Sequence, residues 1–147
     1  MSDNFKNFNS KFNVDELLIV QTEYWRWSLR PIQCTFGAGI LSLRRPAETM
    51  SELSADEGAD LIKITKIIES TLRSAYGMDK MNYIMLMMVD IHIHYHVVPR
   101  YAREIEFAGQ IFKDQGWPKS PVLDAEAVDK DTLLTIRDFL KSHVQNN

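Results

Sequence analysis

The chain has 147 residues, of which 45% are apolar and 25% are charged, a composition typical of one globular domain. Its formal net charge of -3 argues against broad electrostatic binding to nucleic acid, and its one cysteine, Cys34, excludes an intrachain disulfide. The polar start of the sequence lacks the apolar segment of a signal peptide, and the longest apolar run, residues 84–89, is too short to span a bilayer. We therefore expect a cytoplasmic protein with no membrane partner, folded as one domain over residues 1–147.

The first third of the chain predicts a short helix followed by two strands. Aromatic residues recur at helical spacing at Phe5, Phe8 and Phe12, which indicates a short docking helix. Residues 17–31 are rich in β-branched and aromatic residues and predict a half-buried strand. The alternating Trp25 and Trp27 are expected in the core or in a dimer interface rather than stacked on a base. Residues 34–46 predict a second strand after a glycine turn.

The strongest helix signal lies in the middle of the chain. Ser54 and Glu57 form a capping box, and Gly77 supplies a stop signal. Between them an apolar stripe recurs at Leu61, Ile64, Ile68 and Leu72. Residues 82–100 then read as one long strand or as two strands joined by a bend. Strands on both sides of one long helix predict an α+β fold with a mainly antiparallel sheet.

The C-terminal extension, about residues 104–147, begins irregularly and ends in a predicted helix over residues 131–143. Its irregular segment, which includes "FKDQGWPKSP", is predicted to serve either as a lid over a site or as an arm reaching across a dimer. The sequence leaves these alternatives open.

Three of the four histidines, His92, His94 and His96, alternate within the predicted strand of residues 82–100. Alternate residues of a strand share one face, with Cα atoms roughly 6.5–7 Å apart, so the three imidazoles can serve one ligand. Asp90 has the same parity and is expected on the same face. Three histidines on a buried face are costly to desolvate without partners, which favours a functional role.

Two kinds of chemistry fit this pattern. Alternate histidines can share a zinc ion with a ligand from elsewhere, although His143, in the predicted last helix, is a poor candidate. Alternatively, a neutral imidazole can attack a phosphorus atom and form a covalent intermediate. That reaction needs an acceptor for the second ring nitrogen and an acid for the leaving oxygen.

The stretch "HIHYHVV", residues 92–98, resembles the His-φ-His-φ-His-φφ signature of the histidine-triad (HIT) family of nucleotide hydrolases and transferases. Pro99-Arg100 and residues 41–54 are also similar to the family pattern, so the resemblance covers roughly residues 14–103. It implies a HIT-like α+β fold, with an antiparallel sheet of about five strands and one long helix, often paired into a homodimer. It also implies a nucleoside phosphate substrate, such as a dinucleoside polyphosphate or a nucleotide phosphoramidate.

The resemblance gives each histidine a role. His94 falls at the position of the nucleophile, and His96 would contact the phosphate and the leaving oxygen. His92 would orient the nucleophile, and the resemblance also implies that a backbone carbonyl of the His92 region keeps the second ring nitrogen of His94 protonated. No cofactor and no metal ligand are required for this reaction, although Mg²⁺ can accompany a polyphosphate substrate.

The chain departs from the family pattern around the predicted site. Ala38 stands where many members have a fourth histidine, and Met87-Met88 replaces a Gly-Gln pair. Arg30 stands at the position of a ribose-binding Asp or Asn, where it is expected either to bind a phosphate or to lie solvated at the surface. Arg100 and Asp90 are the other candidate substrate-binding residues. These departures keep a non-catalytic nucleotide- or metal-binding protein as the alternative function.

Overall fold

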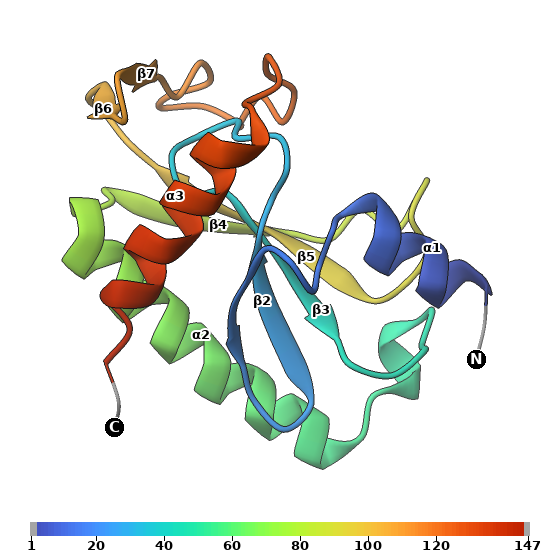
Figure 1. Ribbon diagram of the computed structural model, residues 1–147. Helices are drawn as coiled ribbons and strands as arrows, with labels where there is room; N and C mark the ends of the chain where they lie inside the picture. The colour runs from blue at the N-terminus through green and yellow to red at the C-terminus, as the bar shows by residue number, and fades with distance from the viewer. Residues whose placement is uncertain (1–2, 146–147) are drawn as a thin grey trace.

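The computed structural model describes residues 3–145 and is built on a five-stranded antiparallel sheet (Figure 1). Its strands are β1 (Leu18–Gln21), β2 (Trp25–Leu29), β3 (Gly39–Leu43), β4 (Lys80–Ile84) and β5 (His94–Arg100), in the spatial order β1-β2-β3-β5-β4. A separate ribbon joins β6 (Ile105–Phe107) to β7 (Gln110–Phe112). The predicted α+β fold with about five antiparallel strands is confirmed.

Helices cover both faces of the sheet. They are α1 (Asp3–Lys11), the short 3-10 helix η1 (Met50–Glu52), α2 (Ala55–Tyr76) and α3 (Lys130–Ser142). The main core packs α2 and α3 against one face of the sheet, and α1 lies across the sheet from them (Figure 1). In the described part of the chain, no helix is both long enough and apolar enough to cross a membrane.

The long helix α2 begins and ends where the sequence predicts. The Ser54 side chain accepts a hydrogen bond from the Glu57 backbone N–H, and the Glu57 carboxylate accepts one from the Ser54 N–H. Gly77 ends the helix in the left-handed conformation, with φ of 62°, which glycine adopts without strain. Trp25 donates its indole N–H to the Glu57 carbonyl at 2.8 Å, which fixes the helix on the sheet.

Residues 17–31 and 82–100 each form two strands. In the first segment β1 and β2 make a hairpin. In the second, β4 pairs antiparallel with β5, so the chain must reverse through residues 85–93. Of the two alternatives for residues 82–100, two strands joined by a bend is confirmed. A single triad strand over about residues 82–100 is wrong, because β5 begins at His94 and leaves His92 in the loop. The Leu43 N–H still donates to the Ile93 carbonyl, and this bond keeps His92 beside the end of the strand.

The large apolar side chains at the start of the sequence are covered within one chain. Trp25 and Trp27 are fully buried on the face that carries α2. Phe8 and Phe12 of the N-terminal segment are buried on the opposite face, beside Val14 and Ile40. Of the two places expected for Trp25 and Trp27, the core and a dimer interface, the structure shows the core.

Candidate functional site

The three histidines of the sequence motif meet on the sheet face that carries α1. His94 and His96 point from β5 to this face, and their rings lie at a centroid distance of 5.2 Å and an interplanar angle of 78°. His92 joins them from the preceding loop, where its Nε2 hydrogen-bonds the Leu43 carbonyl at 2.9 Å. The prediction that one face gathers all three imidazoles holds, although only two of them belong to the strand.

The hydrogen bond of His94 selects the nitrogen that can act as a nucleophile. Its Nδ1 lies 2.6 Å from the His92 carbonyl oxygen. A carbonyl can only accept, so the hydrogen is on Nδ1 and the lone pair of the neutral ring is on Nε2. Within residues 3–145, Nε2 of His94 has no hydrogen-bond partner. The main chain thus holds His94 in the tautomer that nucleophilic attack requires.

Burial keeps the triad uncharged. The exposed fractions of His92, His94 and His96 are 2%, 2% and 7%. Burial lowers the pKa of His92 and that of His94 below the ordinary value. For His96, burial together with the nearby charge of Arg30 lowers the pKa to about 4. All three rings are therefore neutral at pH 7, which suits a nucleophile but leaves His96 without the proton that an acid must supply.

We expect the protein to lose stability as the pH falls from about 6.5 toward 4. The unfolded chain binds a proton at His96 near pH 6.5, whereas the folded protein binds it only near the lowered pKa of about 4. Between these values the unfolded state holds more protons, so unfolding becomes easier by on the order of 3 kcal/mol from His96 alone. Urea unfolding at about pH 7 and pH 4.5 measures the effect. The variant His96→Asn should show a smaller loss, and an equal loss in both proteins would contradict the assignment.

Arg30 and Asp90 both lie near the triad. Arg30 donates from Nη1 to the carbonyls of Ile32 and Leu123, at 3.0 and 2.6 Å, and its charge acts on His96. It is thus tied to the loops that border His96, and only partly exposed. Asp90, in the loop before the triad, binds the Lys11 ammonium at 2.8 and 2.9 Å.

Arg100 lies at the far end of β5 from His94 and has a structural partner. Its guanidinium donates to both carboxylate oxygens of Asp114, at 2.6 and 3.0 Å, and to Asn82 at 2.8 Å. Both members of the ion pair are buried. The structure therefore brings together five of the six predicted site residues and places Arg100 in a buried ion pair.

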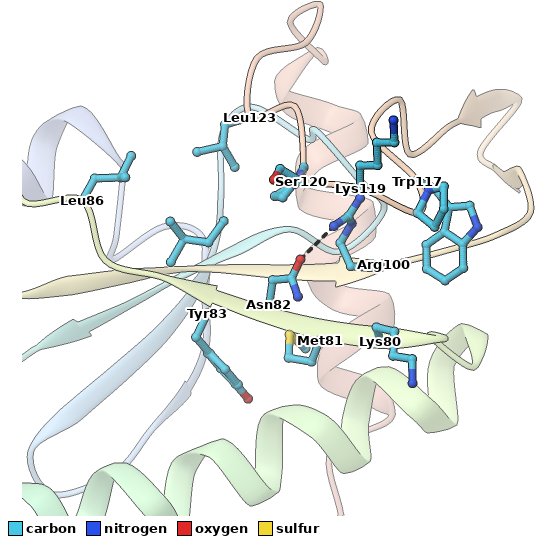
Figure 2. A pocket seen from close by; sticks show the side chains of 13 residues that line it. Lys80, Met81, Asn82, Tyr83, Leu86, Arg100, Trp117, Lys119, Ser120 and Leu123 are labelled. Atoms are coloured by element: carbon cyan, nitrogen blue, oxygen red, sulfur yellow. Dashed lines mark hydrogen bonds between the residues drawn. The ribbon is translucent and has the colours of Figure 1, made fainter.

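A groove of about 1000 Å³ runs along β4 beyond the triad. Figure 2 shows β4 on one side, with Lys80 and Asn82, and the segment of residues 117–123 on the other. Arg100 reaches into it and meets Asn82. None of the three triad histidines lines this groove. The irregular C-terminal segment is therefore one wall of a groove beside the sheet edge, and it does not close over the histidines.

The positions that depart from the family pattern have local structural roles. Ala38 is fully buried against Cys34 and Val98. Met87 adopts a positive φ of 53° in the loop before the triad. That conformation favours glycine, and here a methionine adopts it. In the described residues, no group of three or more His, Cys, Asp or Glu side chains is arranged to hold a metal ion.

The N-terminal helix is the part of the site that sequence reasoning missed. Its phenylalanine rings pack directly on the histidines, with centroid distances of 4.8 Å for Phe5 and His92 and 4.9 Å for Phe8 and His94. The helical spacing of the phenylalanines predicted an apolar face but gave no indication of what that face contacts. The Leu43 carbonyl, which binds the His92 ring, was also not predicted, because a main-chain acceptor leaves no mark on a sequence. The His92 carbonyl, which holds Nδ1 of His94, was expected from the family resemblance.

Comparisons with known proteins agree with the fold. No family model matches the chain, and no curated protein matches it. Several solved structures do match. A histidine triad (HIT) protein from Sinorhizobium meliloti has 20% sequence identity and a TM-score of 0.69, over 90% of this chain and 93% of that one. A Zn-bound histidine triad family protein from Mycobacterium smegmatis has 18% identity and a TM-score of 0.64, over 93% and 91%.

A third structure, a hypothetical histidine triad nucleotide-binding protein from Sulfolobus tokodaii, has 17% identity and a TM-score of 0.62, over 86% of this chain and 82% of that one. The chain therefore has the HIT-like fold that its histidine motif predicted.

Proposed function

We propose that this chain is a HIT-family nucleotide hydrolase or nucleotidyl transferase that works through a covalent nucleotidyl-His94 intermediate. The observation that carries the proposal is the 2.6 Å bond between His94 Nδ1 and the His92 carbonyl, which leaves Nε2 as the nucleophilic atom. The lowered pKa of His94 supports it, because a neutral imidazole is available at physiological pH. The substrate is a nucleoside phosphate with a good leaving group, either a dinucleoside polyphosphate or a nucleotide phosphoramidate.

In the proposed reaction His94 Nε2 attacks the α-phosphorus in line with the bond to the leaving group. The new N–P bond forms as the bond to the leaving oxygen or nitrogen breaks, and His96 protonates that atom. Water then attacks the same phosphorus, gives a proton to His96, which is neutral after the first step, and forms the new O–P bond as the N–P bond breaks. The nucleotide is released and His94 is restored as a neutral imidazole. A bound phosphate raises the pKa of His96 through its negative charge, which gives the residue the proton that it lacks in the free protein. Mg²⁺ can accompany a polyphosphate substrate, although no step requires it.

The other predicted residues divide between substrate and scaffold. Arg30 carries a positive charge beside His96, and we propose that it binds the phosphate in place of a ribose contact. Asp90 forms an ion pair with Lys11, and we propose that it affects the site only by holding that residue in place. Arg100 already donates to Asp114 and Asn82, so its proposed share in binding is limited to its surface in the groove.

The alternative is a protein that binds a nucleotide or a metal without catalysis. The burial of His94 and the absence of a histidine at position 38 keep this alternative in view. The Mycobacterium smegmatis relative is described as Zn-bound, so zinc must be tested for this chain as well.

The deciding experiment is a substrate panel with rapid quenching. Diadenosine polyphosphates and adenosine phosphoramidates are mixed in excess over the enzyme, and the quenched protein is analysed by mass spectrometry for a nucleotidyl group on His94. We expect a burst of product matched by the adduct, with and without a chelator. Stoichiometric zinc, with activity lost on chelation and restored by zinc, would favour the metal reading instead. Nucleotide binding without adduct or turnover would establish the non-catalytic alternative.

We also propose that the protein forms a cytoplasmic homodimer through the open edge of its sheet. The edge strand β4 is only half-buried, and the loop that follows it exposes Leu86, Met88 and Val89. The opposite edge strand, β1, is contacted by α3. Two β4 strands related by a twofold axis would join the sheets through an isologous interface of about 2,000 Å².

The predicted dimer is checked by sedimentation at micromolar concentration. We expect one species at twice the chain mass, and the variant Leu86→Lys should shift it toward monomer, because it places a charge beside the paired edge. Ile111→Lys makes the same change at an exposed apolar residue of β7 and should leave the dimer intact. Wild-type protein that sediments as a monomer would rule out the dimer.

A further inference from the structure

The triad of the described structure is closed by the first helix of the chain. Phe8 contacts two of the histidines, with ring centroids 4.9 Å from His92 and 4.9 Å from His94. Phe12 lies 6.0 Å from His94 and 6.5 Å from His96. A phosphate group cannot approach His94 Nε2 over this face while the phenylalanine rings are seated there. The reaction proposed above therefore requires that α1 leave its place.

Polar atoms beneath α1 lack hydrogen-bond partners. Within residues 3–145, seven buried side-chain polar atoms have no hydrogen-bond partner, and four of them lie on this face: the hydroxyl oxygens of Ser28 and Ser42, Nδ1 of His96 and Nε of Arg26. The other three belong to Trp27, Arg30 and Thr35. Ser28 and Ser42 face α1 because strand pairing aligns Ser42 with His94 and Ser28 with Ile40, which itself lies opposite His96. Both serines are fully buried. Unpaired buried polar groups are rare and costly, so their grouping on one face indicates that a polar molecule satisfies them in another state.

Around its buried phenylalanine rings, α1 is held to the rest of the protein by polar contacts that water can replace. Lys11 pairs with Asp90, and the Lys11 side chain is about half exposed. Asn9 accepts a hydrogen bond from Arg26 at 2.8 Å, and Asn4 donates one to Glu48 at 3.3 Å. The helix has only 9 residues, and helices shorter than about 12–15 residues are marginal on their own in water. Once unseated, α1 is therefore expected to unfold, while the strands of the sheet remain paired.

We propose that α1 is a movable cover over the nucleoside site, and that the nucleoside of the substrate replaces it on the sheet. In the closed state Phe8 and Phe12 occupy the floor formed by Ser28, Ser42 and the triad. In the open state the hydroxyl groups and ring nitrogens of a nucleoside satisfy the polar atoms of that floor. The proposal rests on the function proposed above for its ligand, but the opening of α1 can be measured without any turnover.

The first test measures access to His94 in the full-length protein. Diethyl pyrocarbonate modifies neutral histidine, and mass spectrometry follows the modification of each histidine separately. Because the rate follows the fraction of open molecules, Phe8→Ala should raise the rate at His94 at least tenfold. Phe112→Ala removes a ring that is also buried, but in the core on the other side of the sheet, and should leave that rate unchanged. Equal modification rates of His94 in wild type and Phe8→Ala would contradict the proposal that α1 covers the site.

The second test follows α1 during ligand binding by hydrogen exchange, with AMP as the probe. If AMP displaces α1, the amides of residues 5–11 should exchange faster in the complex, while those of β3 and β5 become protected. Slower exchange of α1 in the AMP complex would show that the helix stays seated and would overturn the proposal. Failure of AMP to bind would count against the proposed function. The modification rate of His94 in the first test would still decide whether α1 opens.

A third measurement tests whether the Ser42 hydroxyl binds the ligand or serves only the stability of the fold. Ser42→Ala removes an unpaired buried hydroxyl, so the free protein should unfold at a higher temperature than wild type. The same variant should bind AMP about three- to tenfold more weakly, since a hydrogen bond of the open state is lost. Opposite effects on stability and affinity are expected only if the hydroxyl serves the ligand. Unchanged AMP affinity would remove Ser42 from the site.

Discussion

Replacing His94 with alanine is expected to abolish turnover of any nucleotide substrate while the fold persists. The loss of a covalent nucleophile lowers the rate by several orders of magnitude, because no other group replaces the lone pair at Nε2. The substitution removes one hydrogen bond to the main chain and the contacts of the His94 ring with Phe8 and Phe12, while the strand pairing of β5 is made by backbone atoms and remains. Single-turnover kinetics with an adenosine phosphoramidate measures the rate of the chemical step.

A fourth histidine supplies the matched control for this substitution. His143 lies at the end of α3, where its Nδ1 is 3.1 Å from the Ser74 hydroxyl, on the face of the sheet away from the triad. His143→Ala should retain full activity. If His94→Ala kept its rate within about threefold of wild type, a change of less than 1 kcal/mol in the barrier, His94 would have no part in the reaction.

Replacing Asp114 with asparagine is expected to give the largest loss of stability. Arg100 would keep its charge in a buried position without its carboxylate, and breaking such a pair costs about 3–5 kcal/mol. Asp114 also accepts the Tyr101 N–H at 3.2 Å, so the change disturbs the end of β5. Urea unfolding measures the loss. An Asp138→Asn variant breaks the exposed pair with Arg137 and should cost less than about 1 kcal/mol.

The double variant Arg100→Met with Asp114→Leu distinguishes a scaffold role from ligand binding. Well-packed apolar residues often replace a buried ion pair without loss, so most of the stability lost in Asp114→Asn should return. If Arg100 serves only the scaffold, the double variant should also keep the KM of the wild type. A raised KM at restored stability would show that Arg100 contacts the substrate, as the sequence predicted.

The histidine motif and α2 could be read from the sequence because each depends on local spacing. Alternation places the imidazoles on one face whatever the strand pairs with. A capping box and a glycine fix the ends of α2 through bonds that span only a few residues. These features can therefore be predicted without knowledge of the tertiary structure.

The remaining parts of the site depend on contacts between distant segments. The apolar run of residues 84–89 reads as a continuation of the strand, yet the chain turns there because β5 must reverse to pair with β4. The partner of Arg100 comes from the irregular segment that follows β7, which carries no periodic signal. The face on which α1 packs is likewise decided by the finished sheet, and helical spacing alone does not specify it.

The strand order has a consequence for how the protein folds. Strands β3 and β4 follow one another along the sequence with α2 between them, yet β5 is inserted between them in the sheet. The His92 ring bonds the Leu43 carbonyl across 49 residues, and such distant pairings are slow to form, because the intervening chain must be ordered first. The three imidazoles therefore come together only when β5 inserts between β3 and β4. On refolding, nucleotide-binding capacity should appear with the last kinetic phase and not with the early formation of helix.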